Sequence, residues 1–197
     1  MIHYCCQCAH PMHLRIPPGD SLPRAVCDHC GFIHYENPRL VVGCIATWQE
    51  RILLCRRAIE PRHGFWTLPA GFMENGETTA AAAARETREE ACAELGTLTP
   101  FAMVSIPHIH QVHLFYRSEV VDGAHHPGEE SLETQLFAAA DIPWEALAFR
   151  SVRYGLQRFL EDRERGIFGF HSTDLEPLPE AQSSLRKNST GTGTLKL

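Results

Sequence analysis

The sequence predicts an α+β fold in which a mixed sheet lies between helices and follows a small cysteine-rich unit. Apolar runs typical of strands begin near residue 37, alternate irregularly with two helical segments, and pair as apparent hairpins. Five of the eight cysteines lie before that point. We therefore expect a ribbon unit over 1–36, a sheet domain over 37–166, and a flexible, polar tail over 167–197.

Strands are expected wherever apolar residues alternate or run together. NPRLVVGCIATW and RILLCRR indicate a hairpin, and GFWTLPAGF indicates one strand that leads into a glycine-containing loop. Further strands are expected in FAMVSIPHIHQVHLFYRSEV, which Pro107 interrupts, and in TQLFAA.

Two segments indicate helices. TTAAAAARETREEACAEL is rich in alanine, the best helix former, with Thr78 or Thr79 as a candidate cap and Gly96 as the expected end. DIPWEALAFRSVRYGLQRFLEDRER indicates the second helix, or a short turn followed by that helix, with Asp141 as a candidate cap and Pro143 near the start.

Charge and composition restrict the possible functions. The chain has 197 residues, 44% of them hydrophobic, and 24 acidic against 18 basic residues, which gives a net charge of −6. This balance makes nucleic acid an unlikely partner, because polyanion binding relies on basic patches. No export signal or apolar run of roughly 20 residues is visible, so a cytoplasmic location without membrane contact is expected.

Four cysteines form two C-x-x-C pairs separated by 18 residues, the sequence form of a tetrahedral thiolate site: Cys5, Cys8, Cys27 and Cys30. Without a signal peptide, thiols and metal are more plausible than disulfides. Zn²⁺ is the favoured ion, with iron in a rubredoxin-like site as the alternative. Such ribbons occur in nucleic-acid proteins, but this one has no basic stripe, so a structural or docking role is expected.

The first helix carries three crowded carboxylates. At about 100° per residue, Glu86, Glu89 and Glu90 fall on one narrow face, and we expect that face to point away from the core. Like charges at this spacing repel one another, whereas a bound Mg²⁺ or Mn²⁺ would remove the repulsion. The alternative is a solvated charged face.

The spacing around these acids matches a known signature. GFMENGETTAAAAARETREEACA resembles the Nudix hydrolase signature, G-x5-E-x7-R-E-U-x-E-E-x-G-U with U aliphatic, from Gly71 to Glu90. The resemblance covers residues 37 to 165 and implies a mixed sheet sandwiched between helices. Thr87 replaces an aliphatic residue, and Cys92 replaces a glycine, which suggests that the helix continues to Gly96.

The resemblance also implies an activity, hydrolysis of the diphosphate of a nucleoside diphosphate linked to another moiety. It implies a set of oxygen ligands for catalytic Mg²⁺ or Mn²⁺: Glu86, Glu89, Glu90 and the backbone carbonyl of Ala70. Arg85 would orient the carboxylates, while Gly71 and Glu77 would support the geometry of loop and helix.

The general base and the substrate contacts are less sharply indicated. Family members often draw one more acid from a later loop, and GEESLETQLF offers Glu130, with Glu133 second. A solvated acidic loop is the alternative, and Glu89 or Glu90 could also act as the base. Arg56 and Arg57 end a strand and could contact the diphosphate; the alternative is that they face solvent.

Phe72 could stack on a base, although aromatic residues at strand positions usually belong to the core.

A ribbon before such a domain resembles the NADH pyrophosphatases, which carry an S-Q-P-W-P-F-P-type segment where this chain has SIPHIHQVHLFYRS. The layout is more similar to a compact ribbon-Nudix group related to plant FAD pyrophosphatases. That resemblance implies ADP-ribose or FAD as the substrate, release of AMP, and a possible homodimer. NADH pyrophosphatase or RNA decapping activity and a non-catalytic nucleotide sensor remain alternatives.

Overall fold

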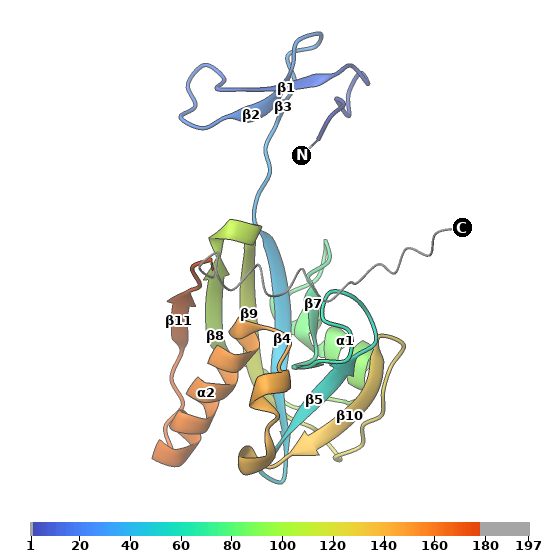
Figure 1. Ribbon diagram of the computed structural model, residues 1–197, viewed down its shortest axis with the longest axis vertical. Coiled ribbons are helices and arrows are strands. Elements are labelled where there is room, and N and C mark those ends of the chain that lie inside the picture. The colour runs from blue at the N-terminus through green and yellow to red at the C-terminus, as the bar shows by residue number, and fades with distance from the viewer. Residues whose placement is uncertain (1, 178–197) are drawn as a thin grey trace, which may run out of the picture. The chain divides into compact units, whose positions relative to one another are not determined.

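The chain divides into two compact units, one ending at Pro38 and one beginning at Arg39. The computed structural model describes residues 2–177, and both units are drawn in Figure 1. The boundary lies two residues beyond the position that the sequence indicates. No helix in this described range has both the length and the apolar character needed to cross a membrane.

The first unit is a small antiparallel sheet with the strand order β1-β2-β3. Its strands are β1 (Met12–Arg15), β2 (Arg24–Cys27) and β3 (Ile33–His34). Few of its described residues are buried: Cys5, Pro17, Ala25, Val26 and Cys27. So little buried apolar surface cannot hold a unit of this size together without a further constraint.

The second unit is built on a mixed sheet with the order β10-β5-β4-β9-β8-β11. Neighbouring strands are parallel in the pairs β4–β9 and β8–β11 and antiparallel elsewhere, as predicted for a mixed sheet. The strands are β4 (Arg39–Trp48), β5 (Arg51–Arg57), β8 (Thr99–Ile106), β9 (Gln111–Glu119), β10 (Ser131–Phe137) and β11 (His171–Asp174).

Two helices cover opposite faces of this sheet, α1 (Thr79–Ala91) and α2 (Arg150–Arg165) (Figure 1). Alternate residues of one strand point to opposite faces. Accordingly, Ile45 of β4 packs in the cluster that contains Leu156 of α2, whereas Cys44 packs in the cluster that contains Ala83 of α1. The predicted sandwich of a mixed sheet between helices is therefore confirmed.

The segment GFWTLPAGF forms two short strands instead of the single strand expected. β6 (Trp66–Thr67) pairs with β5, and β7 (Ala70–Phe72) pairs with β4. Pro69 lies between them and has no amide hydrogen to donate to a ladder. Its carbonyl oxygen instead accepts a hydrogen bond from the Cys44 amide at 3.1 Å, which carries the chain from one strand partner to the next.

Helix α1 begins where the sequence indicates but ends earlier. The Thr78 side chain accepts a hydrogen bond from the Ala81 amide, which makes Thr78 the cap. The expectation that the helix continues to Gly96 is wrong, because Cys92 adopts a left-handed conformation with φ of 47°. Backbone amides of the loop before β10 donate hydrogen bonds to the last carbonyl groups of α1. The His126 amide donates to the Ala91 carbonyl at 2.9 Å, and the Gly128 amide donates to the Glu90 carbonyl at 3.0 Å.

Before α2 the structure shows the alternative in which short turns precede the helix. The predicted cap Asp141 ends a short 3-10 turn, η2 (Ala139–Asp141), and Pro143 lies between it and a second turn, η3 (Trp144–Ala146). Helix α2 starts only at Arg150. A third turn, η1 (Pro107–Ile109), separates β8 from β9, as Pro107 predicts.

The expectation of a tail from residue 167 onward is wrong for its first part. Residues 171–174 form β11, which pairs in parallel with β8 at the edge of the sheet. Asp162 of α2 holds β11 and the loop before it, because its carboxylate accepts hydrogen bonds from the Gly169 amide at 2.9 Å and from His171 Nε2 at 2.7 Å. The remainder of the expected tail, 178–197, lies outside the described residues.

Candidate active site and zinc centre

The four paired cysteines of the ribbon unit converge on one point. The Sγ–Sγ distances are 3.6 Å for Cys5–Cys30, 3.5 Å for Cys8–Cys27 and 3.4 Å for Cys8–Cys30. A tetrahedron with Zn–S bonds of 2.3 Å has sulfur–sulfur edges of roughly 3.8 Å. All four sulfurs lie within 4.8 Å of one another and none forms a disulfide, so the set fits a tetrahedral Zn²⁺.

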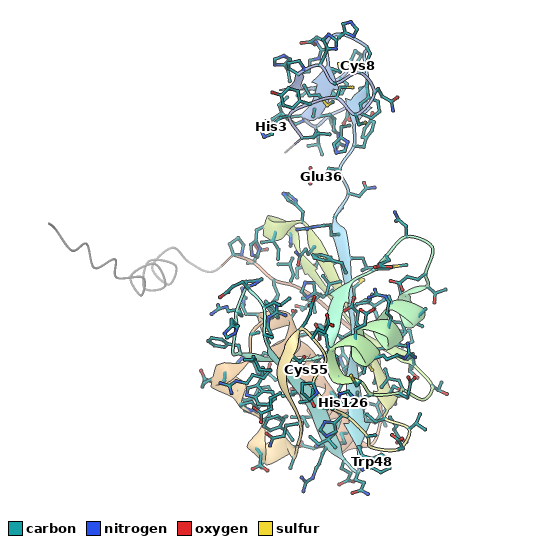
Figure 2. The ribbon with its side chains drawn as sticks, turned by 90° about the vertical axis from the view of Figure 1, so that its right-hand side faces the viewer. His3, Cys8, Glu36, Trp48, Cys55 and His126 are labelled. Atoms are coloured by element: carbon teal, nitrogen blue, oxygen red, sulfur yellow. The ribbon has the colours of Figure 1, made fainter. Side chains whose placement is uncertain are left out.

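The same local turn builds both halves of this centre. The Ala9 amide donates to the Cys5 carbonyl at 2.8 Å, and the Gly31 amide donates to the Cys27 carbonyl at 2.9 Å. Ala9 and Gly31, each directly after a C-x-x-C pair, have positive φ angles of 59° and 75°. The Cys30 amide is the main group that lowers the pKa of Cys27, to about 6, whereas, against the effect of the His10 amide, burial and the neighbouring thiols raise the pKa of Cys8 to about 12. Figure 2 labels Cys8 of this set.

In the second unit, Arg85 ties the loop before α1 to the helix. It donates to both carboxylate oxygens of Glu77, from Nε at 3.1 Å and from Nη2 at 2.8 Å, and to the Phe72 carbonyl at 3.1 Å. Its Nη1 donates to Glu86 at 2.8 Å and to Glu89 at 2.9 Å. One guanidinium thus fixes three carboxylates and the end of β7, an arrangement for which arginine's planar array of donors is suited.

The expectation that the three acids point away from the core is wrong for two of them. Glu86 is 8% exposed and Glu90 is 5% exposed, whereas Glu89 is exposed. The buried face of α1 is Ala82, Ala83, Glu86, Thr87, Glu90 and Ala91. The helix therefore packs with two carboxylates turned inward, which sequence periodicity does not anticipate.

The backbone of β7 makes room for these acids. The Ala70 amide donates to Glu90 Oε2 at 3.1 Å. A Cβ on Gly71 would lie 2.3 Å from Glu86 Oε2, so a side chain at this position would displace Glu86. Thr87, where an aliphatic residue is usual, satisfies its buried hydroxyl by donating to the Ala83 carbonyl at 2.8 Å.

The buried acids lack sufficient positive charge around them. The pKa of Glu90 is raised to about 8, mainly by burial and also by the nearby Glu86, while the Ala70 amide and Arg57 oppose this shift. Burial likewise raises the pKa of Glu86. Unlike the thiols, the carboxylates of Glu86, Glu89 and Glu90 are not all within 4.8 Å of one another. Arg85 holds two of them and the Ala70 amide holds the third. As hard oxygen donors with unmet negative charge, they fit a divalent cation such as Mg²⁺ or Mn²⁺.

These acids form one wall of a cavity of about 1340 Å³. Of the predicted site residues, those that line it are Ala70, Gly71, Phe72, Arg57, Arg85, Glu86, Glu89, Glu90 and Glu130. Arg56 and Glu133 do not line it and instead lie 3.7 Å apart as an exposed ion pair between β5 and β10. Successive strand residues face opposite sides, so only one of the adjacent Arg56 and Arg57 can reach the cavity.

Glu130 reaches the cavity because its loop is fastened to the end of α1. The Gly128 amide bonds to the Glu90 carbonyl, and the Ala58 amide bonds to the Glu130 carbonyl at 2.8 Å. A Cβ on Gly128 would lie 1.7 Å from the Glu89 carbonyl oxygen, so this contact requires glycine. Glu130 adds to the rise in the pKa of Glu86 and Glu90, after burial, which indicates that the three carboxylates share one electrostatic environment.

Sequence reasoning missed a second polar group in the cavity wall. His113 of β9 is buried, and it contacts Ser151 of α2 at 2.9 Å and Gln111 at 3.0 Å. All three residues line the cavity. Ser151 lies 38 positions from His113 in the chain, so only the packing of α2 on the sheet reveals the pair.

Comparison with known proteins agrees with this geometry. The NUDIX domain family model matches residues 37–158, and the Nudix N-terminal family model matches residues 3–36. The chain is 46% identical to a NUDIX hydrolase of known structure from Nitrosomonas europaea, with a TM-score of 0.83 over 88% of this chain and all of that one. An ADP-ribose pyrophosphatase from Streptococcus suis is 18% identical, with a TM-score of 0.57 over 70% of this chain and all of that one, which shows the fold alone.

Among curated relatives, the NAD-capped RNA hydrolase NudC of Salmonella typhi is 37% identical over 89 residues. That match covers 44% of this chain and 32% of the relative, so it spans about a third of the relative's length. The domain model, in contrast, covers well over half of the chain. On this ground the protein belongs to the Nudix hydrolase family, and it carries that family's N-terminal zinc ribbon.

Proposed function

We propose that the protein hydrolyses the diphosphate bond of a nucleoside diphosphate linked to another moiety, with ADP-ribose or FAD as the preferred substrate and AMP as a product. The cavity carries this proposal. Its volume of about 1340 Å³ exceeds the roughly 300–1,000 Å³ of ordinary small-molecule sites, and the acidic helix forms one of its walls. A substrate with its diphosphate at these acids would have room for a group on either side.

The reaction splits one P–O–P bond with one water molecule. The oxygen of water bonds to one phosphorus, and the bridging oxygen leaves with the other, so ADP-ribose gives AMP and ribose 5-phosphate while FAD gives AMP and FMN. Mg²⁺ or Mn²⁺ held by Glu86, Glu89, Glu90 and the Ala70 carbonyl would neutralise the diphosphate and lower the pKa of bound water.

The protein's own groups supply position and proton transfer. Arg85 keeps Glu86 and Glu89 in place through its bonds to both, and the Ala70 amide orients Glu90. Glu130 faces the same cavity and is the favoured general base, with Glu89 or Glu90 as the alternative. Arg57 lines the cavity close enough to lower the pKa of Glu90, and it is the stronger candidate for a diphosphate contact.

The choice of ADP-ribose or FAD over NADH rests on one segment. SIPHIHQVHLFYRS, which replaces the segment typical of NADH pyrophosphatases, contributes Ile106, His108, Gln111 and His113 to the cavity wall. The difference from those enzymes therefore falls where a substrate would be recognised. NAD-capped RNA, named for the Salmonella relatives, is the second candidate, and the net charge of −6 weighs against it.

The test is AMP release from ADP-ribose, FAD, NADH, diadenosine polyphosphates and NAD-capped RNA, with Mg²⁺ and then Mn²⁺. We expect ADP-ribose or FAD to be hydrolysed fastest, and the Glu89→Gln/Glu90→Gln double variant to be inactive. Glu94→Gln is the matched control, because Glu94 is exposed and pairs with Arg88 outside the cavity. Tight binding of one compound without hydrolysis would instead identify a nucleotide sensor.

A further inference from the structure

One polar cluster in the cavity wall has no part in the proposed hydrolysis. It consists of Gln111 and His113 on β9 and Ser151 in the first turn of α2. His113 is 8% exposed and Ser151 is 1% exposed, whereas Gln111 is half-buried and borders the cavity. A buried imidazole and a buried hydroxyl need fixed hydrogen-bond partners, and each finds one inside this cluster.

In the structure the side-chain oxygen of Gln111 faces His113. Its Oε1 can only accept, so His113 Nε2, 3.0 Å away, carries the proton and donates. His113 Nδ1 then accepts from the Ser151 hydroxyl at 2.9 Å. Burial lowers the pKa of His113 to about 4, which keeps the ring neutral and this chain of donors intact near pH 7.

With its oxygen at His113, the amide nitrogen of Gln111 is the atom left for a ligand in the cavity that Gln111 lines. Among the described residues, no protein acceptor bonds to that nitrogen. In this orientation the glutamine offers two hydrogen-bond donors.

The cavity places this donor within reach of a substrate at the acidic helix. Val41 of β4 is paired with Phe72 on one side and with His113 on the other, so Phe72 and His113 share a sheet face, roughly 10 Å apart. Gly71, against which the Glu86 carboxylate lies, precedes Phe72 and faces the other side of the sheet. One cavity is lined by residues of both sides, Glu86 and Gly71 as well as Val41 and Gln111, so a group attached to a diphosphate at the acids can extend within it to Gln111.

We propose that Gln111 is a specificity-determining residue whose amide nitrogen donates to an acceptor atom, a ring nitrogen or a carbonyl oxygen, on a heteroaromatic base of the substrate. His113 and Ser151 are positioning residues, because they act on the substrate only through the orientation of Gln111. The inference rests on the proposed function for the place of the diphosphate. Sites built to hydrogen-bond a substrate discriminate strongly against analogues that lack the partner atom.

The experiment measures binding, so that it does not depend on turnover. ADP-ribose and FAD are titrated calorimetrically, with Mg²⁺, into a Glu90→Gln variant and into the same variant with Gln111→Leu. We expect Gln111→Leu to raise the Kd about tenfold, equivalent to about 1.4 kcal/mol. A higher Kd for both ligands identifies adenine as the recognised base, and a higher Kd for FAD alone identifies the flavin.

Analogues then locate the contact. If adenine is the base, one of the 1-deaza, 3-deaza and 7-deaza forms of ADP-ribose should bind about tenfold more weakly, and Gln111→Leu should cause it no further loss. Ser151→Ala should raise the Kd less than Gln111→Leu, because it frees the ring without removing the donor. Gln135→Leu, the same change at an exposed residue away from the cavity, should change nothing.

The proposal is overturned if Gln111→Leu leaves every Kd within twofold, or if it weakens all the analogues equally. Failure of the proposed function is a separate result, namely wild-type protein that binds these ligands but releases no AMP. In that case, the role of Gln111 still stands or falls on the measured Kd values.

Discussion

The two units of this chain place their metal-binding groups in opposite ways. In the ribbon, four thiols approach to 3.4–3.6 Å with no cationic side chain among them, and only five described residues of that unit are buried. In the sheet domain, Arg85 and the Ala70 amide hold the carboxylates of Glu86, Glu89 and Glu90, and the apolar cluster on one face of the sheet supports the helix that carries them.

The difference separates a metal needed for folding from a metal needed for chemistry. The ribbon has little else to hold it together, so its metal would supply folding free energy directly. The sheet domain has a packed apolar core and holds its acids in place with protein donors, so it can fold first and bind a cation afterwards. Each prediction below tests one side of this contrast.

Loss of zinc should produce the largest effect. Structural Zn²⁺ contributes apparent free energies of about 10–16 kcal/mol in small zinc domains, far more than the buried surface of the ribbon can replace. We expect one zinc per chain by metal analysis, and we expect chelation or Cys27→Ser to abolish the dispersed amide NMR signals of residues 2–36. The signals of the sheet domain should persist.

Cys6→Ser is the control, because Cys6 is exposed and lies outside the thiol cluster. Ribbon signals that survive chelation would remove the contrast, since both units would then fold without metal.

Glu90→Gln should separate activity from stability in the sheet domain. Removing a ligand for the catalytic cation should lower kcat by about 10²–10³-fold, or roughly 3–4 kcal/mol. The free energy of unfolding should stay the same or rise, because burial already raises the pKa of this carboxyl to about 8 and an amide carries no charge to desolvate. AMP release and urea unfolding provide the two measurements.

A fall in the unfolding free energy by more than about 1 kcal/mol, a typical net hydrogen-bond contribution, would show that the acid stabilises the fold. Glu94→Gln is the control for the loss of a negative charge, because Glu94 is an exposed acid that pairs with Arg88.

The sequence was most informative where spacing alone decides the chemistry. The two C-x-x-C pairs and the Nudix signature from Gly71 to Glu90 could be identified because each of their residues has a fixed distance along the chain to the next. The burial of Glu86 and Glu90 could not be predicted, since periodicity places polar residues outward and does not show that β7 provides an amide and a missing side chain to receive them.

Long-range pairings explain the other differences. Strand β11 (171–174) shows no apolar alternation in the sequence. It is held by hydrogen bonds to the buried Asp162 and by pairing with β8 at the edge of the sheet. The Gln111–His113–Ser151 cluster likewise depends on which face of β9 meets α2. In both cases the deciding partner lies on another element of the fold.

Asp162→Asn should reveal a charge that stabilises the sheet domain without metal. The buried carboxylate accepts from Gly169 and His171, and loss of its charge should lower the unfolding free energy by about 1–3 kcal/mol. The His171 hydrogen bond is the main cause of the lowered pKa of Asp162. Because the folded pKa lies below the unfolded value, this stabilisation is present above the unfolded pKa and is lost as the pH falls through the folded pKa.

Urea unfolding between pH 7 and pH 3 measures this effect, with Asp174→Asn, an exposed acid on β11, as the control. A variant that loses stability in parallel with the wild type over the whole acidic range would show that Asp162 is not the group responsible.

The smallest effect is expected at two of the non-glycine residues with positive φ, Ala9 in the ribbon and Cys92 at the end of α1. The left-handed conformation costs a non-glycine residue about 1–2 kcal/mol, and glycine loses about 0.5–1 kcal/mol in backbone entropy, so Cys92→Gly should stabilise the sheet domain by roughly 0.5–1 kcal/mol. Cys92→Ala should give no such gain, because it retains the Cβ, and an equal gain would assign the effect to the thiol.

Ala9→Gly should raise the stability of the ribbon only while zinc is bound, because without zinc no folded turn exists there to be relieved. If Ala9→Gly also stabilised metal-free protein, the turn would form before the metal, and the ribbon would resemble the sheet domain in building its site in advance.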